Sequence, residues 1–279
     1  MAFIRSRRLL CAFQIVFFIS IIALWGCSDD EDNPVGVGLA EWEKVEGARF
    51  PLAVGNRWVY AARSSWTDQL NQEFSAEEET EVILEITAEE EVLGQKAFRL
   101  EITHHLKSKR DTVRARTWFA MVGDSLIGLA SAGDLGSLEP LYGQLFKPVV
   151  QEEPEGWGIV ALVFPLKEGK SWSLLRSSED ASSTFFAERR KIVKGKEQIS
   201  VPAGEYDTFK IVDDLKGIKS LKGEIAQWFS PVGLVKYEED TKSYGIPTDE
   251  QGMPIEGQEQ LLNQWISSME LVEVEFKEK

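Results

Sequence analysis

Hydrophobic and polar residues alternate with a period of two along much of this chain. The alternation covers residues 82–87, 98–103, 208–211, 224–229 and 272–277. This pattern is typical of half-buried β-strands, whose successive side chains point to opposite faces. Helical spacing occurs only among Leu261, Leu262, Trp265, Ile266 and Met269. We therefore expect a mostly β protein of about eleven strands, with at most one or two short helices.

The pattern also repeats over a longer distance. Phe-Pro-Leu-Ala-Val-Gly-Asn-Arg-Trp at residues 50–58 is matched by Phe-Pro-Leu-Lys-Glu-Gly-Lys-Ser-Trp at residues 164–172. Further on, Thr-Trp-Phe-Ala-Met-Val-Gly at residues 117–123 is matched by Gln-Trp-Phe-Ser-Pro-Val-Gly at residues 227–233. The repeat places four tryptophans at matched positions, Trp58 with Trp172 and Trp118 with Trp228. We expect Trp58 and Trp172 to be buried, because each follows a turn and begins a strand.

Two related halves predict two antiparallel meanders. They could form separate domains or join into one large curved sheet or half-open barrel. Joining is favoured, because a half with few strands exposes a long edge that pairing would cover.

The N-terminus has the pattern of a secretory signal, in which an apolar stretch at residues 9–24 follows three arginines, Arg5, Arg7 and Arg8. Leu24, Trp25 and Gly26 then precede Cys27 and resemble the lipobox of bacterial lipoproteins, in which the cysteine accepts a diacylglyceryl group. Trp25 departs from that pattern, since a small or β-branched residue is usual there. The alternative is an uncleaved transmembrane helix, for which residues 9–26 are barely long enough.

Cys27 is expected to be the only cysteine of the mature chain, because Cys11 lies within the signal. No disulfide would then form, and lipid attachment is the best explanation for the thiol. We expect membrane association through N-terminal acyl chains.

An acidic run follows this cysteine directly, formed by Ser28, Asp29, Asp30, Glu31 and Asp32. It resembles the short export tag of surface-displayed lipoproteins in some Gram-negative bacteria. It is also compatible with a flexible, solvated spacer. We expect an outer-membrane lipoprotein that is exposed at the surface, or otherwise faces the periplasm.

These features divide the chain into five parts. They are a lipoprotein signal peptide at residues 1–26, an acidic tether at 27–47, a first β repeat at 48–133, a crossover loop at 134–160, and a second β repeat with a C-terminal strand at 161–279.

The net charge is −15 and becomes −18 without the three signal arginines. An acidic surface repels phosphate backbones, so nucleic-acid binding is disfavoured.

Signatures of catalysis, metal binding and cofactor binding are lacking in the sequence. Gly169-Lys170-Ser171 imitates the end of a phosphate-binding loop, but Phe164 stands where the first glycine is required. His104 and His105 are adjacent on a predicted strand, so their side chains should point to opposite faces. The acidic doublets at residues 152–153, 213–214 and 238–239 are expected on the solvated surface. We therefore predict no catalytic residues, no metal and no cofactor.

Two further segments stand out in the second half. They are Val-Pro-Ala-Gly-Glu-Tyr-Asp-Thr-Phe at residues 201–209 and Trp-Phe-Ser-Pro-Val-Gly-Leu-Val-Lys at residues 228–236. Together with the repeated Phe-Pro-Leu, Gly and Trp, they resemble a broad group of bacterial lipoproteins over residues 50–239. The architecture of that group is similar to the half-open β-barrel of the LolA/LolB lipoprotein carriers. This is a resemblance of shape, and fold alone does not imply activity.

Three functional hypotheses remain open. The first is a non-catalytic envelope module or scaffold whose sheet shelters an apolar ligand or a lipidated partner, covered by residues 261–269. The second is a surface glycan-binding module that uses tryptophans outside the repeat, chiefly Trp157 and Trp66, with Trp42 and Trp265 as further candidates. The third and least favoured is a hydrolase.

Overall fold

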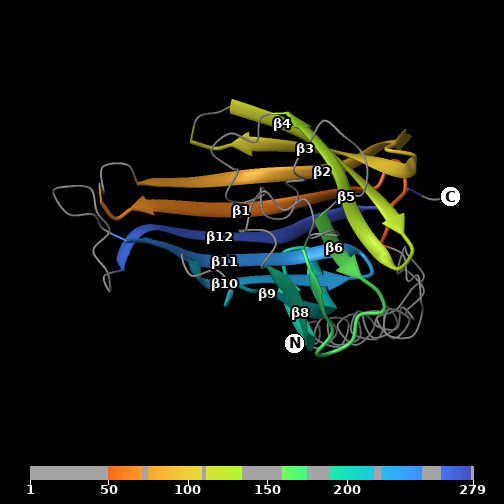
Figure 1. Ribbon diagram of the computed structural model, residues 1–279. Coiled ribbons are helices and arrows are strands. Elements are labelled where there is room, and N and C mark those ends of the chain that lie inside the picture. The colour runs from red at the N-terminus through yellow and green to blue at the C-terminus, as the bar shows by residue number, and fades with distance from the viewer. Residues whose placement is uncertain are drawn as a thin grey trace, which may run out of the picture. The chain divides into compact units, whose positions relative to one another are not determined.

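The computed structural model describes residues 50–70, 75–108, 111–133, 159–174, 189–216, 221–246 and 259–277 of the 279-residue chain. All of them belong to one compact unit, Val37–Lys279. They form a single twelve-stranded antiparallel sheet in the order β6-β5-β4-β3-β2-β1-β12-β11-β10-β9-β8-β7 (Figure 1). The strands are β1 Arg57–Asp68, β2 Ala76–Val92, β3 Gln95–Leu106, β4 Asp111–Val122, β5 Ser125–Gly133, β6 Ile159–Val163, β7 Ser171–Ser173, β8 Arg190–Val201, β9 Gly204–Asp214, β10 Leu221–Ser230, β11 Gly233–Gly245 and β12 Gln260–Glu275.

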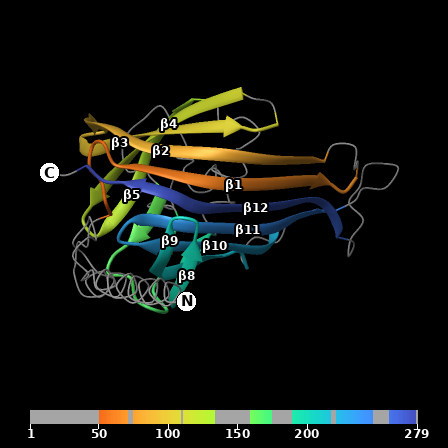
Figure 2. The same ribbon diagram turned by 180° about the vertical axis from the view of Figure 1, so that it is seen from behind.

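The strand order confirms the predicted joining of two meanders into one sheet. Each half runs in reverse chain order, β6 to β1 and then β12 to β7. The halves meet where β1 pairs with β12, from Arg57 opposite Glu275 to Asp68 opposite Asn263. These two strands lie side by side in both views, although they come from opposite ends of the described chain (Figures 1 and 2).

Matching hydrogen bonds show the duplication in three dimensions. In the first half the turn before β1 is tied to β2, because Gly55 N donates to Ile86 O at 2.7 Å and Ile86 N donates to Asn56 O at 2.9 Å. In the second half Gly169 N donates to Val193 O and Val193 N donates to Lys170 O, both at 2.9 Å. The repeated Phe-Pro-Leu…Gly…Trp sequence therefore builds the same turn twice.

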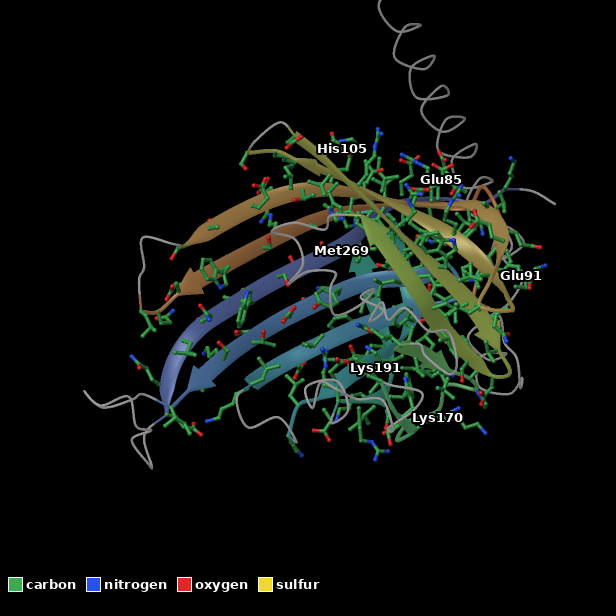
Figure 3. The ribbon with its side chains drawn as sticks, turned by 45° about the horizontal axis from the view of Figure 1, so that its top comes forward. Glu85, Glu91, His105, Lys170, Lys191 and Met269 are labelled. Atoms are coloured by element: carbon green, nitrogen blue, oxygen red, sulfur yellow. The ribbon has the colours of Figure 1, made fainter. Side chains whose placement is uncertain are left out.

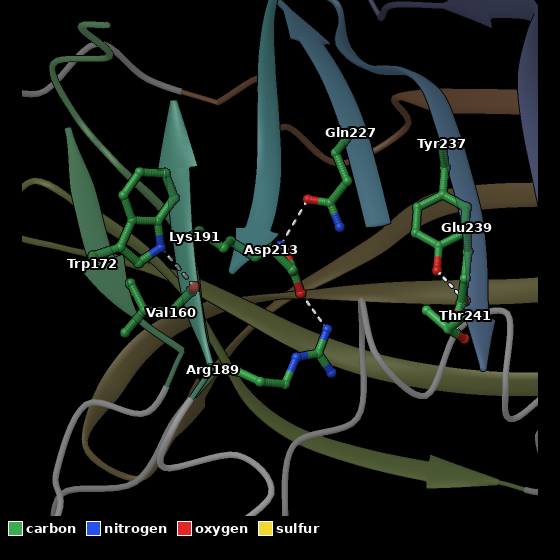
Figure 4. Close-up of polar contacts among 9 residues, drawn as sticks. All are labelled: Val160, Trp172, Arg189, Lys191, Asp213, Gln227, Tyr237, Glu239 and Thr241. Atoms are coloured by element: carbon green, nitrogen blue, oxygen red, sulfur yellow. Dashed lines mark hydrogen bonds and ion pairs between the residues drawn. The ribbon is translucent and has the colours of Figure 1, made fainter. Parts of the chain in front are cut away.

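The two ends of the sheet also meet. Val160 N on β6 donates to Leu174 O, just after β7, at 2.7 Å. The Trp172 indole Nε1 donates to Val160 O at 3.2 Å (Figure 4). These contacts make the sheet a nearly closed barrel, and they give Trp172 a structural role at the seam.

The matched tryptophans divide between the two faces of the sheet. Trp58 and Trp172 are buried in the inner core, as expected for residues that begin strands after a turn. Trp118 and Trp228 lie outside that core and pack in smaller apolar clusters. Each indole donates to a glutamate, Trp118 to Glu90 at 2.9 Å and Trp228 to Glu197 at 2.8 Å.

The prediction of helical structure at residues 261–269 is wrong, because these residues belong to β12. A spacing of four residues fits one face of a helix, but it also fits one face of a strand. Pairing with β1 on one side and β11 on the other decides for the strand. The described residues also hold one strand more than expected. The three-residue β7 is too short to show an alternating pattern.

Several predictions concern residues outside the described ranges. These are the signal peptide, the lipobox, Cys27, the acidic run, Trp42, Trp157, Glu152 and Glu153. The segment boundaries stay predictions; β6 spans the proposed boundary at residue 160 and pairs with β5. Among the described residues, no helix is long and apolar enough to cross a membrane.

Candidate functional site

A cluster of charged and amide side chains lies on the inner face of the sheet. Lys191 on β8 stands directly opposite Asp213 on β9, and its Nζ donates to Asp213 Oδ1 at 3.0 Å and to Gln227 Oε1 at 2.9 Å. Arg189, just before β8, donates to the other oxygen of Asp213 (Figure 4). We call these four residues, Arg189, Lys191, Asp213 and Gln227, the inner polar cluster.

Strand alternation turns these polar groups inward. Asp213 continues the inward row of Phe209 and Ile211 on β9, and Gln227 stands between Ile225 and Phe229 on β10. All four members of the inner polar cluster are at most 6% exposed. Lys191, labelled in Figure 3, belongs to β8, the strand next to the last one of the sheet. The cluster is therefore buried beside the apolar core.

Burial and pairing oppose each other at Asp213. Burial by itself would raise the pKa of this carboxyl group, but the charges of Lys191 and Arg189, with their hydrogen bonds, hold its pKa below the ordinary value. Burial lowers the pKa of Lys191, and Asp213 offsets only part of that effect. The Asp213 carboxylate thus holds the cluster together, since it stabilises both buried cations.

A second buried acid lies on β11. Glu239 accepts hydrogen bonds from Tyr237 at 2.6 Å and from Thr241 at 2.7 Å. Burial raises the pKa of the Glu239 carboxyl group, and the two hydrogen bonds offset part of that rise. Arg189 acts on the same carboxyl group through its charge, so Glu239 lies within electrostatic reach of the inner polar cluster.

The expectation that the acidic doublets lie on the solvated surface is wrong for two of their members. Asp213 and Glu239 are buried, whereas Asp214 is half-buried and Glu238 is exposed. The reason is the period of two, which directs adjacent residues of a strand to opposite faces. One member of each described doublet must therefore face the core.

An apolar cavity adjoins the inner polar cluster. The space open to water-sized molecules within it is about 50 Å³. Its wall is made by Phe50, Trp58, Tyr60, Leu84, Leu100, Phe119, Leu126, Ile159, Ala161, Lys191, Gln227, Phe229 and Leu234. The polar atoms of two aromatic residues are already used, because Trp58 donates to Val232 O at 2.6 Å and Tyr60 donates to Leu234 O at 2.8 Å. Lys191 and Gln227 therefore form the polar end of this cavity.

A larger and more open hollow, which we call the outer hollow, borders Asp213. β9 and β10 pair only at residues 226–229 of β10, and beyond Val212 their pairing stops. Asp213, Asp214, Gly223 and Glu224 contribute to the wall of a hollow of about 440 Å³ at this place. Asp213 thus borders the outer hollow, while its partner Lys191 borders the inner cavity.

The two histidines lie as predicted. His104 is fully buried and His105 is half-buried, on opposite faces of β3. Burial, helped by the neighbouring His105, lowers the pKa of His104 to about 4. Across the described ranges, no group of three His, Cys, Asp or Glu side chains is placed to hold a metal ion.

The remaining candidates among the described residues are Trp66, Trp265 and Lys170. Trp66 stands directly opposite Trp265 where β1 pairs with β12, and both are half-buried. Lys170 belongs to the Gly-Lys-Ser sequence that resembles the end of a phosphate-binding loop. Its Nζ donates to the backbone oxygens of Phe164 at 2.7 Å and Pro165 at 3.1 Å. Its ammonium group therefore closes a turn.

Sequence reasoning missed the inner polar cluster and Glu239. A usable signal was present, because Asp213 shares the parity of Phe209 and Ile211 and so had to face inward with them. Lys191, two positions before Val193, follows the same rule. What the pattern lacks is any indication that these residues meet.

No protein-family model matches this chain, and no curated protein sequence matches it. Among solved structures, a candidate lipoprotein from Parabacteroides distasonis is 15% identical with a TM-score of 0.35, covering 81% of this chain and 97% of its own.

A domain of a candidate outer membrane lipoprotein-sorting protein from Vibrio parahaemolyticus is 10% identical with a TM-score of 0.26, covering 86% of this chain and 92% of its own. A LolA-superfamily protein from Nitrosomonas europaea is 10% identical with a TM-score of 0.21, covering 88% and 96%. Similarity at this level says nothing of ligand or activity.

Proposed function

We propose that this protein is a lipid-anchored, non-catalytic binding module of the cell envelope whose barrel-shaped sheet holds a small apolar ligand in its interior. The observation that carries the proposal is the inner cavity. Eleven of its wall residues are aliphatic or aromatic, and the indole and hydroxyl groups among them are hydrogen-bonded to the backbone. Concave, mostly apolar walls with few polar groups are typical of sites for small molecules.

The buried charges support a binding role over catalysis. Asp213 is held by two cations, and Glu239 is held by Tyr237 and Thr241. A general base needs a free lone pair within reach of a substrate proton. Asp213 and Glu239 are instead buried, and their hydrogen bonds hold partners that fix the interior.

The anchor part of the proposal rests on Cys27 and the acidic run after it. Cys27→Ser should abolish labelling by radioactive fatty acid and release the protein from the membrane fraction. Replacing Asp29, Asp30, Glu31 and Asp32 by asparagine or glutamine should make the protein resistant to protease added to whole cells, without loss of acylation. Unchanged labelling of the Cys27→Ser variant would refute the anchor.

The cavity is tested with xenon, an apolar atom that fits a small space. Xenon under pressure should shift the methyl NMR signals of Leu84, Leu100 and Leu126. Ala161→Leu should remove these shifts, because the added carbons fill the cavity. Ala61→Leu, on the exposed outer face of β1, is the matched control and should leave them intact. Wild-type methyl signals that do not respond to xenon would contradict a binding cavity.

The pair of Trp66 and Trp265 favours a second candidate function, glycan binding. Two adjacent half-buried indoles offer an apolar surface on which a sugar ring can stack. Tryptophan fluorescence should then respond to one of a panel of polysaccharides, and Trp66→Ala should lose the response while Trp118→Ala keeps it. A response that survives in Trp66→Ala excludes this surface.

A further inference from the structure

A buried lysine belongs to the wall of the inner cavity. Lys191 is 3% exposed, and the other wall residues are aliphatic or aromatic except for Gln227. Among these wall residues, Lys191 alone carries an amino group. A lysine amine that is removed from water in an apolar pocket is a nucleophile toward carbonyl compounds. The cavity therefore combines an apolar space with a group that can form a covalent bond.

Two hydrogen-bond acceptors orient this amine. Asp213 Oδ1 lies 3.0 Å and Gln227 Oε1 lies 2.9 Å from Lys191 Nζ. The nitrogen is tetrahedral, so the side-chain carbon and these two hydrogen bonds leave one direction open for its last substituent. In the neutral amine, the lone pair takes that direction while both hydrogens stay on the two acceptors. The nucleophilic lone pair is thus held in one orientation, which favours reaction over that of a freely rotating lysine.

The surroundings of Lys191 also favour the neutral amine. Burial lowers the pKa of Lys191, Asp213 offsets part of that effect, and the charge of Arg189 adds to it. A lysine with a lowered pKa holds more of the neutral form at neutral pH than an exposed lysine does. Asp213 Oδ1 is within hydrogen-bonding distance and can take up the proton that the ammonium group releases.

Condensation with an aldehyde preserves the charges of the inner polar cluster. The lone pair of Lys191 Nζ forms a bond to the carbonyl carbon, and the carbonyl π electrons move to the oxygen. Two of the three ammonium protons end on that oxygen, the C–O bond breaks to release water, and the remaining nitrogen lone pair forms the C=N bond. One hydrogen and one positive charge stay on the nitrogen. The protonated imine therefore replaces the ammonium group beside Asp213, and no buried charge loses its partner.

The size and the chemistry of the wall limit the carbonyl compound. A space of about 50 Å³ takes a molecule of few atoms. Because the carbonyl oxygen leaves as water, the bound chain presents only hydrocarbon to walls whose indole and hydroxyl groups already donate to the backbone. An aldehyde fits better than a ketone, since a second carbon substituent adds bulk next to Nζ. Asp213 also borders the outer hollow, so the water is released close to an open space.

We propose that Lys191 binds short aliphatic aldehydes covalently and reversibly, as an imine whose hydrocarbon chain occupies the inner cavity. This proposal rests on the proposed function, because it names the ligand class of the same cavity.

Reductive trapping tests the imine. The full mature protein is incubated with propanal and sodium cyanoborohydride, which reduces an imine to a stable secondary amine, and peptide mass spectrometry locates the modified lysines. Propylation of Lys191 should be at least about tenfold faster than that of Lys167, an exposed lysine just before β7, because each unit of lowered pKa leaves about tenfold more neutral amine. Pivaldehyde, whose branched chain is too bulky for the cavity, should modify Lys191 no faster than Lys167.

Cavity variants show whether the reaction needs the apolar space. Ala161→Leu should lose the fast propylation of Lys191, because the added carbons occupy the place of the propyl chain. Ala61→Leu, on the exposed outer face of β1, is the matched control and should keep it. Circular dichroism checks that both variants are folded. Should Ala161→Leu fail to fold, the comparison of propanal with pivaldehyde in the wild type still tests the size limit.

The outcomes distinguish this inference from the function beneath it. Propylation of Lys191 that is no faster than that of Lys167, or that is equally fast in folded Ala161→Leu, overturns the imine. Equal modification by propanal and pivaldehyde overturns it as well. The xenon experiment decides separately whether the cavity binds apolar molecules, so methyl shifts that persist in these cases leave the proposed function standing.

Discussion

His104 should make the protein less stable in mild acid. The side chain is fully buried on β3, opposite Val82 on β2 and Val113 on β4. Burial lowers its pKa from 6.5 to about 4. Between these values the unfolded chain holds a proton that the folded protein does not. Stability must therefore fall as the pH falls through this window, and it is fully restored above pH 6.5.

The magnitude follows from the size of the shift. Each pKa unit corresponds to 1.36 kcal/mol, so a decrease from 6.5 to about 4 makes unfolding easier by about 3 kcal/mol at pH 4 than at pH 7.5. A domain with a typical stability of 5–15 kcal/mol would lose a substantial part of it.

Urea unfolding followed by far-UV circular dichroism, from pH 4 to pH 8, measures this effect. Other acids titrate in the same range, so the informative quantity is the difference in unfolding free energy between the wild type and His104→Leu. That difference should change by about 3 kcal/mol across the window. His105→Leu, on the opposite face of the same strand, serves as the control; it removes only the smaller, charge-based contribution to the His104 shift and should retain most of the wild-type pH dependence. A difference for His104→Leu that stays constant to within about 0.5 kcal/mol would refute the reasoning.

Three further predictions concern the buried acids and the strand backbone. Asp213→Asn should destabilise the protein by about 3–5 kcal/mol, because it leaves two buried cations without their carboxylate, whereas the half-buried neighbour Asp214→Asn should cost less than about 1 kcal/mol; urea unfolding measures both. Because burial raises the pKa of Glu239, its ionisation makes the folded wild type less stable as the pH rises from 5 to 7. The Glu239→Gln variant cannot ionise at this position, so its stability should fall less over the same range. Thermal unfolding at several pH values checks the sign. Gly223→Ala should be more destabilising than Gly94→Ala, because a Cβ at residue 223 would lie 2.0 Å from a backbone oxygen, while at residue 94 it meets nothing within 4 Å and only the positive φ is unfavourable; equal melting temperatures would contradict this.

Local patterns predicted the strands well where they were long and half-buried. β2 and β3 each alternate over many residues, and each appears in the structure where the pattern placed it. β12 was misread because its apolar residues recur every four positions, a spacing shared by helices and strands. β7 was missed because three residues cannot display a period.

The candidate site was far less predictable. Lys191 and Asp213 are 22 residues apart, and Lys191 and Gln227 are 36 apart. Each occupies an inward position by simple parity, yet nothing near it in the chain shows that a partner lies opposite. Their meeting depends on the register of β8 against β9 and of β9 against β10.

The sequence by itself determined the β class, the duplicated halves and the matched tryptophans, because these features arise from neighbouring residues and from one repeated segment. Only the tertiary structure decided that β1 pairs with β12, that β6 reaches β7 at the seam, and that four polar side chains converge beside an apolar cavity. Alternation assigns a side chain to a face of the sheet. Strand order and register alone determine which side chains from distant strands share that face at hydrogen-bonding distance, and in a buried interior that proximity sets their charge states.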